Sequence, residues 1–266
     1  MKFKKSALAF VSTMVLAIGT ASANNLVLNG DFQSFTGGYT SGGVSGIPSQ
    51  LNDTGTGGYT KLDNWTVGPG SSGLLAFLMS PTTADTTGSR DIRFNNNFAL
   101  HGPGNGSNNG LTGSSNGGYY VALDASSTYR GSGISQAISG MTAGHQYVVS
   151  FEWAAAQQST YHGPTTEQLE VSLGNSHQMT SLVNNPDAGF QPWTKQSFTF
   201  TYDGVHNILN FLSLGGPDGL PPFVLLDGVS LEAAPVPEPG SMALSLLGIA
   251  GLGLAAWRRR RLASAV

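Results

Sequence analysis

Apolar and polar side chains alternate along several short stretches in the middle of this chain. Residues 147–153, 169–173 and 198–202 place apolar side chains at every second position, with polar ones between them. A period of two is typical of a β-strand that has one face buried and the other in water. Apolar runs bounded by turn residues predict further strands at 25–32, 62–67, 73–79, 118–124, 133–138, 206–214 and 223–232.

About ten short strands without a long helical period predict an all-β fold, and their spacing favours a β-sandwich. Residues 24–235 are numerous enough to bury their own core, so we expect one domain there. Two stretches, 33–61 and 80–117, are rich in Gly, Ser, Thr and Asn and interrupt the strands. Long loops of this kind are either functional or disordered, so an ordered excursion over one end of the sandwich and a mobile segment both remain open.

The N-terminal end has a different pattern. Three lysines within the first five residues precede an apolar stretch at 7–18, and Ala21 and Ala23 supply the small residues that signal peptidase requires. We therefore expect residues 1–23 to form a signal helix that is removed, which leaves a mature chain beginning at Asn24.

The C-terminal end has three parts in order. Pro237, Glu238 and Pro239 come first, and an uncharged apolar run at 240–257 follows. As a helix this run would extend roughly 27 Å, just enough to cross a hydrocarbon core of about 30 Å as a single transmembrane helix. Because basic residues stay on the cytoplasmic side, we expect 24–235 to lie outside the inner membrane. A cluster of four arginines closes the tail: Arg258, Arg259, Arg260 and Arg261.

This order of segments, over residues 236–261, resembles the PEP-CTERM sorting signal of Gram-negative bacteria. The resemblance implies processing by an exosortase, a membrane-embedded cysteine protease that cuts near the Pro-Glu-Pro and passes the protein to the cell surface or the exopolysaccharide matrix. A permanent single-span anchor is the alternative. Either way, the tail indicates where the protein goes and not what it does there.

Without its two ends the chain is strongly acidic. Five Lys and Arg residues oppose 14 Asp and Glu residues between 24 and 235. Binding to nucleic acid requires clustered basic residues, so we expect no nucleic-acid partner. An acidic surface of this kind would suit divalent cations or neutral sugars. The chain has no cysteine, which excludes disulfides, a thiolate nucleophile and cysteine metal sites.

The mature region also resembles galactose-binding-like jelly rolls, a group that includes several families of carbohydrate-binding modules. The resemblance implies a jelly-roll β-sandwich that binds glycans. It extends in the same order over nearly the whole of the mature region and depends on six segments: 25–32, 63–67, 118–124, 133–138, 143–151 and 225–231.

Many domains of this group hold a structural calcium ion between the first and the last strand, in a site of hard oxygen ligands. Asp227 matches the ligand near the C-terminus, whereas Gln33 stands where the group has a glutamate. Asp124 is a further candidate ligand if its strand end lies nearby. The alternative is that both aspartates cap turns through their own backbone.

Aromatic and polar residues in loops are the candidate glycan contacts. Trp65 and Trp153 lie on apolar strand faces, so we expect them in the core. Solvated loop residues are the alternative explanation for the four candidates, which are Tyr129, Arg130, Tyr161 and His162.

Catalytic patterns are scarce. Glu152 and Glu170 lie on polar strand faces and could form a glycosidase pair if their strands pair, because such enzymes need two facing carboxyl groups. The five histidines are dispersed without the spacing of a zinc site. The sequence therefore predicts an exported, non-catalytic surface or matrix protein with a structural, adhesive or glycan-binding role. A glycosidase and a structural surface protein without a ligand are the alternatives.

Overall fold

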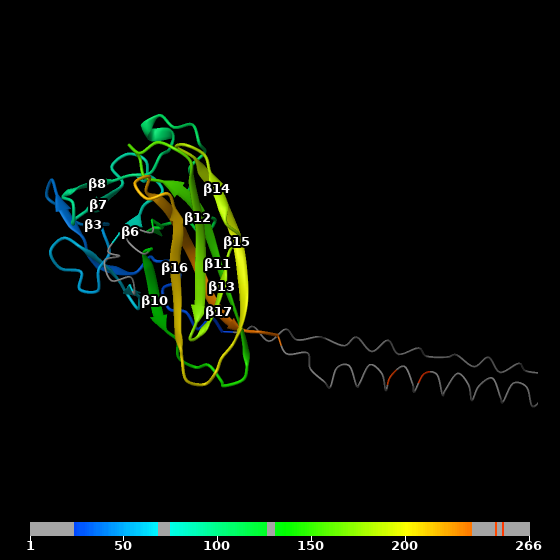
Figure 1. Cartoon of the computed structure of the whole chain (residues 1–266). Coiled ribbons are helices and arrows are strands. Elements are labelled where there is room, and N and C mark those ends of the chain that lie inside the picture. Colours follow the sequence, from blue (N-terminus) through cyan, green and yellow to red (C-terminus); the bar gives the residue numbers. More distant parts are fainter. Residues whose placement is uncertain (1–23, 69–74, 127–130, 236–247, 249–251, 253–266) are drawn as a thin grey trace, which may run out of the picture.

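The structure is a computed structural model that describes residues 24–68, 75–126 and 131–235, together with positions 248 and 252. Two antiparallel sheets face each other, so the all-β prediction and the β-sandwich are confirmed (Figure 1). No helix within the described residues is long and apolar enough to span a membrane. The predicted signal helix lies outside the described residues, as does the predicted transmembrane helix apart from positions 248 and 252.

A five-stranded and a six-stranded sheet form the sandwich. The first has, in order, β15 (Phe190–Thr201), β11 (Gln146–Gln157), β17 (Pro222–Ala233), β9 (Tyr120–Asp124) and β6 (Ala76–Met79). The second has, in order, β13 (Ser176–Met179), β12 (Thr165–Leu173), β16 (Ile208–Gly216), β10 (Gly133–Ala137) and β5 (Thr66–Val67), and β14 (Val183–Asn185) also pairs with β12. From β9 to β12, and again from β15 to β17, each connection crosses to the other sheet, as in a jelly roll.

The main core lies between the two sheets. Strand β12 alternates buried and half-buried residues along its whole length, and the predicted strand at 169–173 is its second half. Phe151 of β11 meets Phe211 of β16 edge to face, with 5.5 Å between ring centroids. Trp65 and Trp153 are both buried in this core, which confirms their predicted packing role.

A second core covers the outer face of the five-stranded sheet. Phe98 stacks on Phe77 of β6 at 4.3 Å and lies 4.4 Å from Phe223 of β17, measured between ring centroids. Every residue of β6 and β9 is buried, because these strands face the main core on one side and this second core on the other.

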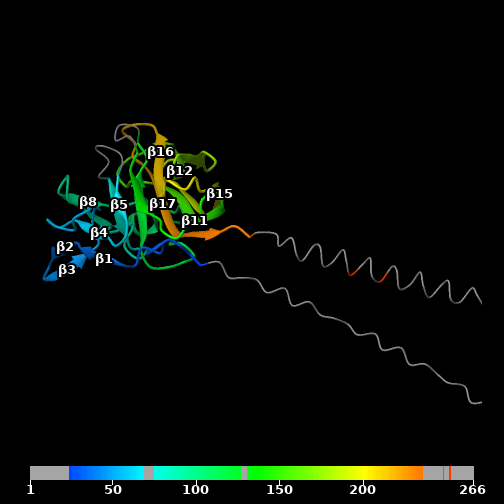
Figure 2. The ribbon, with the colours of Figure 1, turned by 90° about the horizontal axis from the view of Figure 1, so that it is seen from below.

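The stretches 33–61 and 80–117 are ordered, and part of the second provides this cover. They add three two-stranded sheets that the sequence did not predict, and these lie at the left of the molecule in Figures 1 and 2. A short 3₁₀ helix follows at Pro103–Asn105. The added strands are β1 (Phe35–Gly37) with β4 (Thr60–Leu62), β2 (Tyr39–Ser41) with β3 (Val44–Ile47), and β7 (Ser89–Asp91) with β8 (Asn96–Phe98).

The predicted strand at 25–32 is wrong, because the structure has no regular strand there. Asn29 and Phe32 adopt φ angles of 52° and 57°, in the left-handed region, which interrupts an extended chain. Two backbone hydrogen bonds still hold the segment beside β17, from Leu26 N to Leu231 O at 2.8 Å and from Val229 N to Gly30 O at 2.9 Å.

Both ends of the domain lie at one end of the sandwich. Leu26 is bonded to Leu231, and the next residues after β17 return to the start of β11 through a bond from Ala234 N to Gln146 O at 2.8 Å. Both cores are built from residues between 27 and 231. The segment 24–235 therefore contains its own core, as an independently folding domain requires.

The second core gives a stability prediction. We expect Phe98→Ala to lower the free energy of unfolding of the 24–235 segment by about 3–5 kcal/mol, because it leaves a cavity between two buried rings. Phe94→Ala in the same hairpin is the control and should change this free energy by about 0.5 kcal/mol or less, since Phe94 is 52% exposed. Urea unfolding measures both. Equal losses of unfolding free energy in the two variants would show that packing in the second core does not stabilise the fold.

Candidate functional site

A pocket of about 290 Å³ opens where the second core ends. Its inner wall is made of the rings of Phe77, Phe98 and Phe223. Two further rings stand at the pocket with much of their surface in water, since Phe94 is 52% exposed and Tyr161 is 39% exposed. Exposed aromatic side chains on a concave surface are typical of a ligand site.

The pocket lies at the end of the sandwich away from the two chain ends. Phe223 is the second residue of β17 and pairs with Asp124, the last residue of β9. Ala233 ends β17 ten residues later. At about 3.3 Å per residue, the length of β17 separates the pocket from the chain ends by roughly 33 Å.

Two buried carboxyl groups line the same pocket. Asp124 is 1% exposed, and its Oδ1 accepts a hydrogen bond from Ser126 N at 2.8 Å. Burial raises the pKa of Asp124 to about 6. Asp91 is 5% exposed, and burial also raises its pKa, although Arg90 and Arg93 oppose this rise. Groups of this kind can accept hydrogen bonds from the hydroxyls of a ligand, or donate one while they are protonated.

The turn between β7 and β8 fixes Phe94 at the mouth. Asp91 Oδ1 accepts a hydrogen bond from Phe94 N at 3.0 Å, and Gln50 Oε1 accepts one from Arg93 N at 2.9 Å. Asn95 adopts a φ of 53°, a conformation that asparagine tolerates better than most residues. These hydrogen bonds therefore fix the backbone that carries the exposed ring of Phe94.

The structure separates the residues that the sequence proposed as glycan contacts. Tyr161 lines this pocket, whereas His162 lines a neighbouring groove of about 600 Å³ together with His101. The two imidazole centroids are 5.1 Å apart, and His162 Nδ1 is 3.1 Å from Asp187 Oδ1. Tyr129 and Arg130 lie outside the described residues.

Asp124 and Asp227 do not share a site. Asp227 lies four residues along β17 from the partner of Asp124, a separation of roughly 13 Å. Both oxygens of Asp227 already accept hydrogen bonds, from the Ser114 hydroxyl and from Gly228 N at 2.7 Å. The described part of the chain gathers no three His, Asp or Glu side chains as a metal site would. Calcium binding therefore stays a prediction, and at this separation Asp124 and Asp227 would not hold the same ion.

Glu152 and Glu170 do not form a catalytic pair. Strands β11 and β12 belong to different sheets, and both glutamates alternate with residues of the core between the sheets. Their carboxyl groups therefore point outward on opposite faces of the sandwich. The prediction depended on paired strands, and sequence alternation alone cannot say which strands pair.

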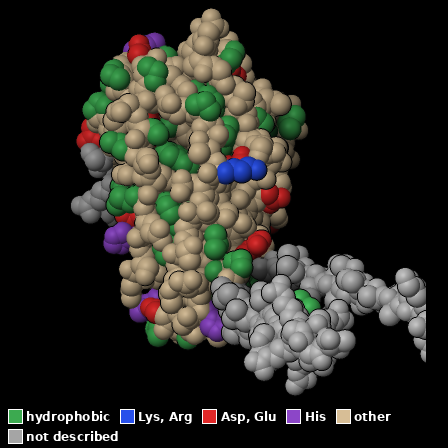
Figure 3. Space-filling model, turned by 90° about the vertical axis from the view of Figure 1, so that its right-hand side faces the viewer, with side chains coloured by type: hydrophobic (Ala, Val, Ile, Leu, Met, Phe, Trp, Pro, Cys, Tyr) green, Lys and Arg blue, Asp and Glu red, His purple; other side chains and the backbone are tan. Residues whose placement is uncertain are grey.

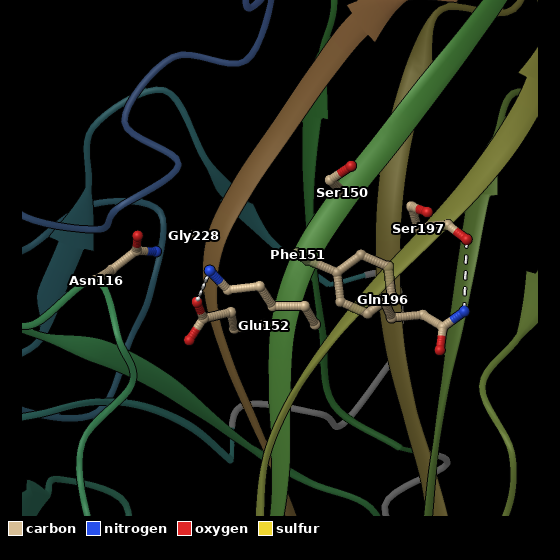
Figure 4. A pocket seen from close by; sticks show the side chains of 8 residues that line it. Asn116, Ser150, Phe151, Glu152, Gln196, Ser197 and Gly228 are labelled. Atoms are coloured by element: carbon tan, nitrogen blue, oxygen red, sulfur yellow. Dashed lines mark hydrogen bonds and ion pairs between the residues drawn. The ribbon is translucent and has the colours of Figure 1, made fainter.

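A shallow pocket on the outer face shows how Glu152 is used instead (Figure 4). Glu152 accepts a hydrogen bond from Ser115 N at 2.9 Å, and Lys195 Nζ lies 3.4 Å from its Oε1. Burial alone would raise the pKa of Glu152, but the bonds from Ser115 and Lys195 lower it below its ordinary value. Glu152 thus holds the segment around Ser115 and Asn116 against the sheet.

The sequence analysis missed Asp91 and Phe94. Both lie in the stretch 80–117, which we treated as a Gly- and Asn-rich interruption. A signal was present, because residues 90–94 read Arg-Asp-Ile-Arg-Phe, a dense group of charged and large apolar side chains inside a polar stretch.

Comparison with known proteins identifies the tail. Residues 235–261 match the PEP-CTERM protein-sorting motif, which confirms the resemblance stated for 236–261. The motif indicates export and processing at a membrane-anchored C-terminus. No curated protein matches the chain in sequence.

Several solved structures align with parts of this chain. An "enzymatically active domain" of tailspike protein 4 from bacteriophage CBA120 is 9% identical, with a TM-score of 0.33 over 65% of this chain, which spans 20% of that tailspike chain. A structure described as a CBM4 is 13% identical, with a TM-score of 0.33 over 78% of this chain and 99% of its own. The N-terminal cellulose-binding domain of a β-1,4-glucanase from Cellulomonas fimi is 19% identical, with a TM-score of 0.28 over 44% and 79%. The sequence identities and TM-scores are low, so the argument for a function depends on the pocket.

The pKa of Asp124 gives a pH prediction. An acid whose pKa is raised by folding adds stability below its unfolded value, near 3.8, and loses that contribution as pH rises through about 6. We expect Asp124→Asn to become more stable relative to the unchanged protein by about 2 kcal/mol between pH 4 and pH 7. Urea unfolding across this range measures the difference. A difference that stays constant with pH would show that Asp124 is not held in its protonated form.

Proposed function

We propose that residues 24–235 form an exported, non-catalytic glycan-binding domain and that the pocket between Phe94 and Tyr161 is its binding site. One observation carries the proposal: two exposed aromatic rings and two buried carboxyl groups lie around the same hollow.

Sugar rings present an apolar C–H face and a rim of hydroxyl groups. An aromatic ring covers the apolar face, and a carboxyl group accepts hydrogen bonds from the hydroxyls. The pocket volume of about 290 Å³ is at the lower end for small-molecule sites, which suits one or two sugar units of a longer polymer.

The tail supports a location for this binding in the cell envelope. In our proposal signal peptidase cuts after Ala23, and an exosortase then cuts near Pro237, Glu238 and Pro239, which releases the domain from the inner membrane to the cell surface or matrix of a Gram-negative bacterium. The glycan available there is exopolysaccharide, so the working role is that of an adhesive or structural component of the biofilm matrix. The matched sorting motif supports the route.

Glycoside hydrolysis is the second candidate function, and the carboxyl groups of the pocket support it. Asp91 and Asp124 are two carboxyl groups in one pocket, and paired carboxyl groups of raised pKa are the machinery of glycoside hydrolysis. The release of reducing ends from bound glycans separates the two functions. Release that Asp124→Asn abolishes would establish the enzyme, and binding without release would establish the binding domain.

Substitution of the exposed rings tests the binding site. We expect Phe94→Ala and Tyr161→Ala each to weaken binding to the best ligand of a polysaccharide panel by about tenfold, roughly 1.4 kcal/mol, because each removes a stacking surface. Leu182→Ala, at a position that is 55% exposed and outside the pocket lining, is the control and should bind normally. Affinity electrophoresis measures retardation. A panel without any ligand would favour a purely structural role.

Substitution in the tail tests the route. When full-length chain is expressed in a bacterium that has an exosortase, Pro237→Ala combined with Glu238→Ala should leave an uncut, membrane-bound form. The unchanged chain should appear as a shorter product in the surface or medium fraction. Immunoblotting of membrane and extracellular fractions measures this. Equal processing of both chains would show that the Pro-Glu-Pro is not the recognised signal.

A further inference from the structure

The pocket and the neighbouring groove of about 600 Å³ are separated only by a ridge made of two chain segments, 98–99 and 158–162. Phe98 lines the pocket, and the next residue, Ala99, lines the groove. In the second segment Tyr161 lines the pocket, whereas Ser159 lines the groove. A hydrogen bond from Ser159 N to Ala99 O at 2.8 Å joins the two segments. The two hollows are therefore adjacent and share one wall.

Buried His101 connects this ridge to the opposite wall of the groove. The residue is 4% exposed, its Nε2 lies 2.8 Å from Tyr161 O, and its Nδ1 lies 3.0 Å from Ser107 Oγ. Because a carbonyl oxygen can only accept a hydrogen bond, Nε2 carries the proton and Nδ1 accepts from the Ser107 hydroxyl. One imidazole ring thus holds both walls, since Ser107 and the ridge residues line the groove from different segments.

The groove presents hydrogen-bonding groups that the protein does not use itself. The hydroxyl groups of Ser159 and Thr160 both belong to the lining, and neither bonds to another described residue. Thr160 adopts a φ of 77°, in the left-handed region, which is strained for a β-branched residue. Strain of this kind persists where the surrounding structure holds it and is concentrated at ligand sites. The ridge therefore holds two unused hydroxyl groups at the groove.

The charge of both hollows favours an uncharged ligand. Asp85 lines the groove, Asp91 and Asp124 line the pocket, and no Lys or Arg is among the described residues that line either one. Figure 3 shows one face of the domain on which uncharged groups dominate and basic side chains are sparse. Carboxylate oxygens accept hydrogen bonds from sugar hydroxyls but repel a polymer that carries negative charge.

We propose that one uncharged polysaccharide chain binds across both hollows. One sugar unit lies against Phe94 in the pocket, the chain crosses the ridge at Tyr161, and the following units bond to the hydroxyls of Ser159 and Thr160 in the groove. This inference depends on the proposed glycan-binding function and adds the extent of the site and the class of ligand. Because the groove has about twice the volume of the pocket, longer chains gain most of their contacts there.

Oligosaccharides of two lengths test the extent of the site. Disaccharides and hexasaccharides of cellulose, xylan, mannan and β-1,3-glucan are titrated into the 24–235 segment by calorimetry. We expect the best hexasaccharide to bind at least tenfold more tightly than its own disaccharide, because only the longer chain reaches the hydroxyl groups of the groove. Hexagalacturonate is the charged comparison and should bind at least fivefold more weakly than the best hexasaccharide.

Matched variants locate the effect in the groove. Ser159→Ala combined with Thr160→Ala should weaken binding of the hexasaccharide at least fivefold and leave binding of the disaccharide within twofold. Phe94→Ala should weaken both lengths by a similar factor, because both occupy the pocket. Ser197→Ala combined with Thr199→Ala removes two hydroxyls from β15, outside both linings, and should change neither affinity by more than twofold. Melting temperatures confirm that each variant is folded.

The outcomes separate this inference from the function on which it depends. A hexasaccharide that binds no more tightly than its disaccharide would overturn the role of the groove and leave glycan binding in the pocket standing. Equal losses for both lengths in the groove variant would also overturn it. Hexagalacturonate as the tightest ligand would overturn the uncharged class. Absence of binding to every oligosaccharide tested would overturn the glycan-binding function as well.

Discussion

Burial of both faces of the five-stranded sheet is the constraint on which the rest of the structure depends. Strands β6, β9 and the first half of β17 are apolar on both sides, so one face packs against the second sheet and the other requires a cover. Residues from the stretch 80–117 supply that cover through Phe98 and its neighbours. Because the same hairpin that brings Phe98 inward turns Phe94 outward, the need for a cover also creates the mouth of the pocket.

The strands that sequence pattern predicts well are those with one wet face. Period two in the sequence predicts the second half of β12, residues 169–173, together with the face that is buried. The unbroken apolar run from Tyr120 to Leu123 is consistent with burial of β9 on both faces. Such a run does not indicate which segment of the chain covers the second face. The opening segment at 25–32 failed for a local reason, since two left-handed residues end its extension although its apolar pattern suits a strand.

The candidate site depends on the stretch 80–117, where apolar and polar residues follow no clear strand or helix period. Tyr161, a candidate glycan contact, does line the pocket. Asp124, a candidate calcium ligand, lines the same pocket as Asp91 and lies far along β17 from Asp227. Which residues meet there follows from strand pairing and from the fold of the β7–β8 hairpin, and neither has a periodic signal in the sequence. The sorting motif differs from the pocket, because it is a continuous segment of the chain and can be identified directly from the sequence.

The two chain ends and the pocket lie at opposite ends of the sandwich, a feature with a consequence for timing. A domain held by its C-terminus presents the pocket on the side that faces away from the attachment point. Under the proposed function, a glycan could then be captured by a chain that is still tethered and retained by the same chain once it has been cut free. Cleavage of the tail would change how far the bound polymer can move from the membrane. The contacts between the pocket and the polymer would be the same before and after cleavage.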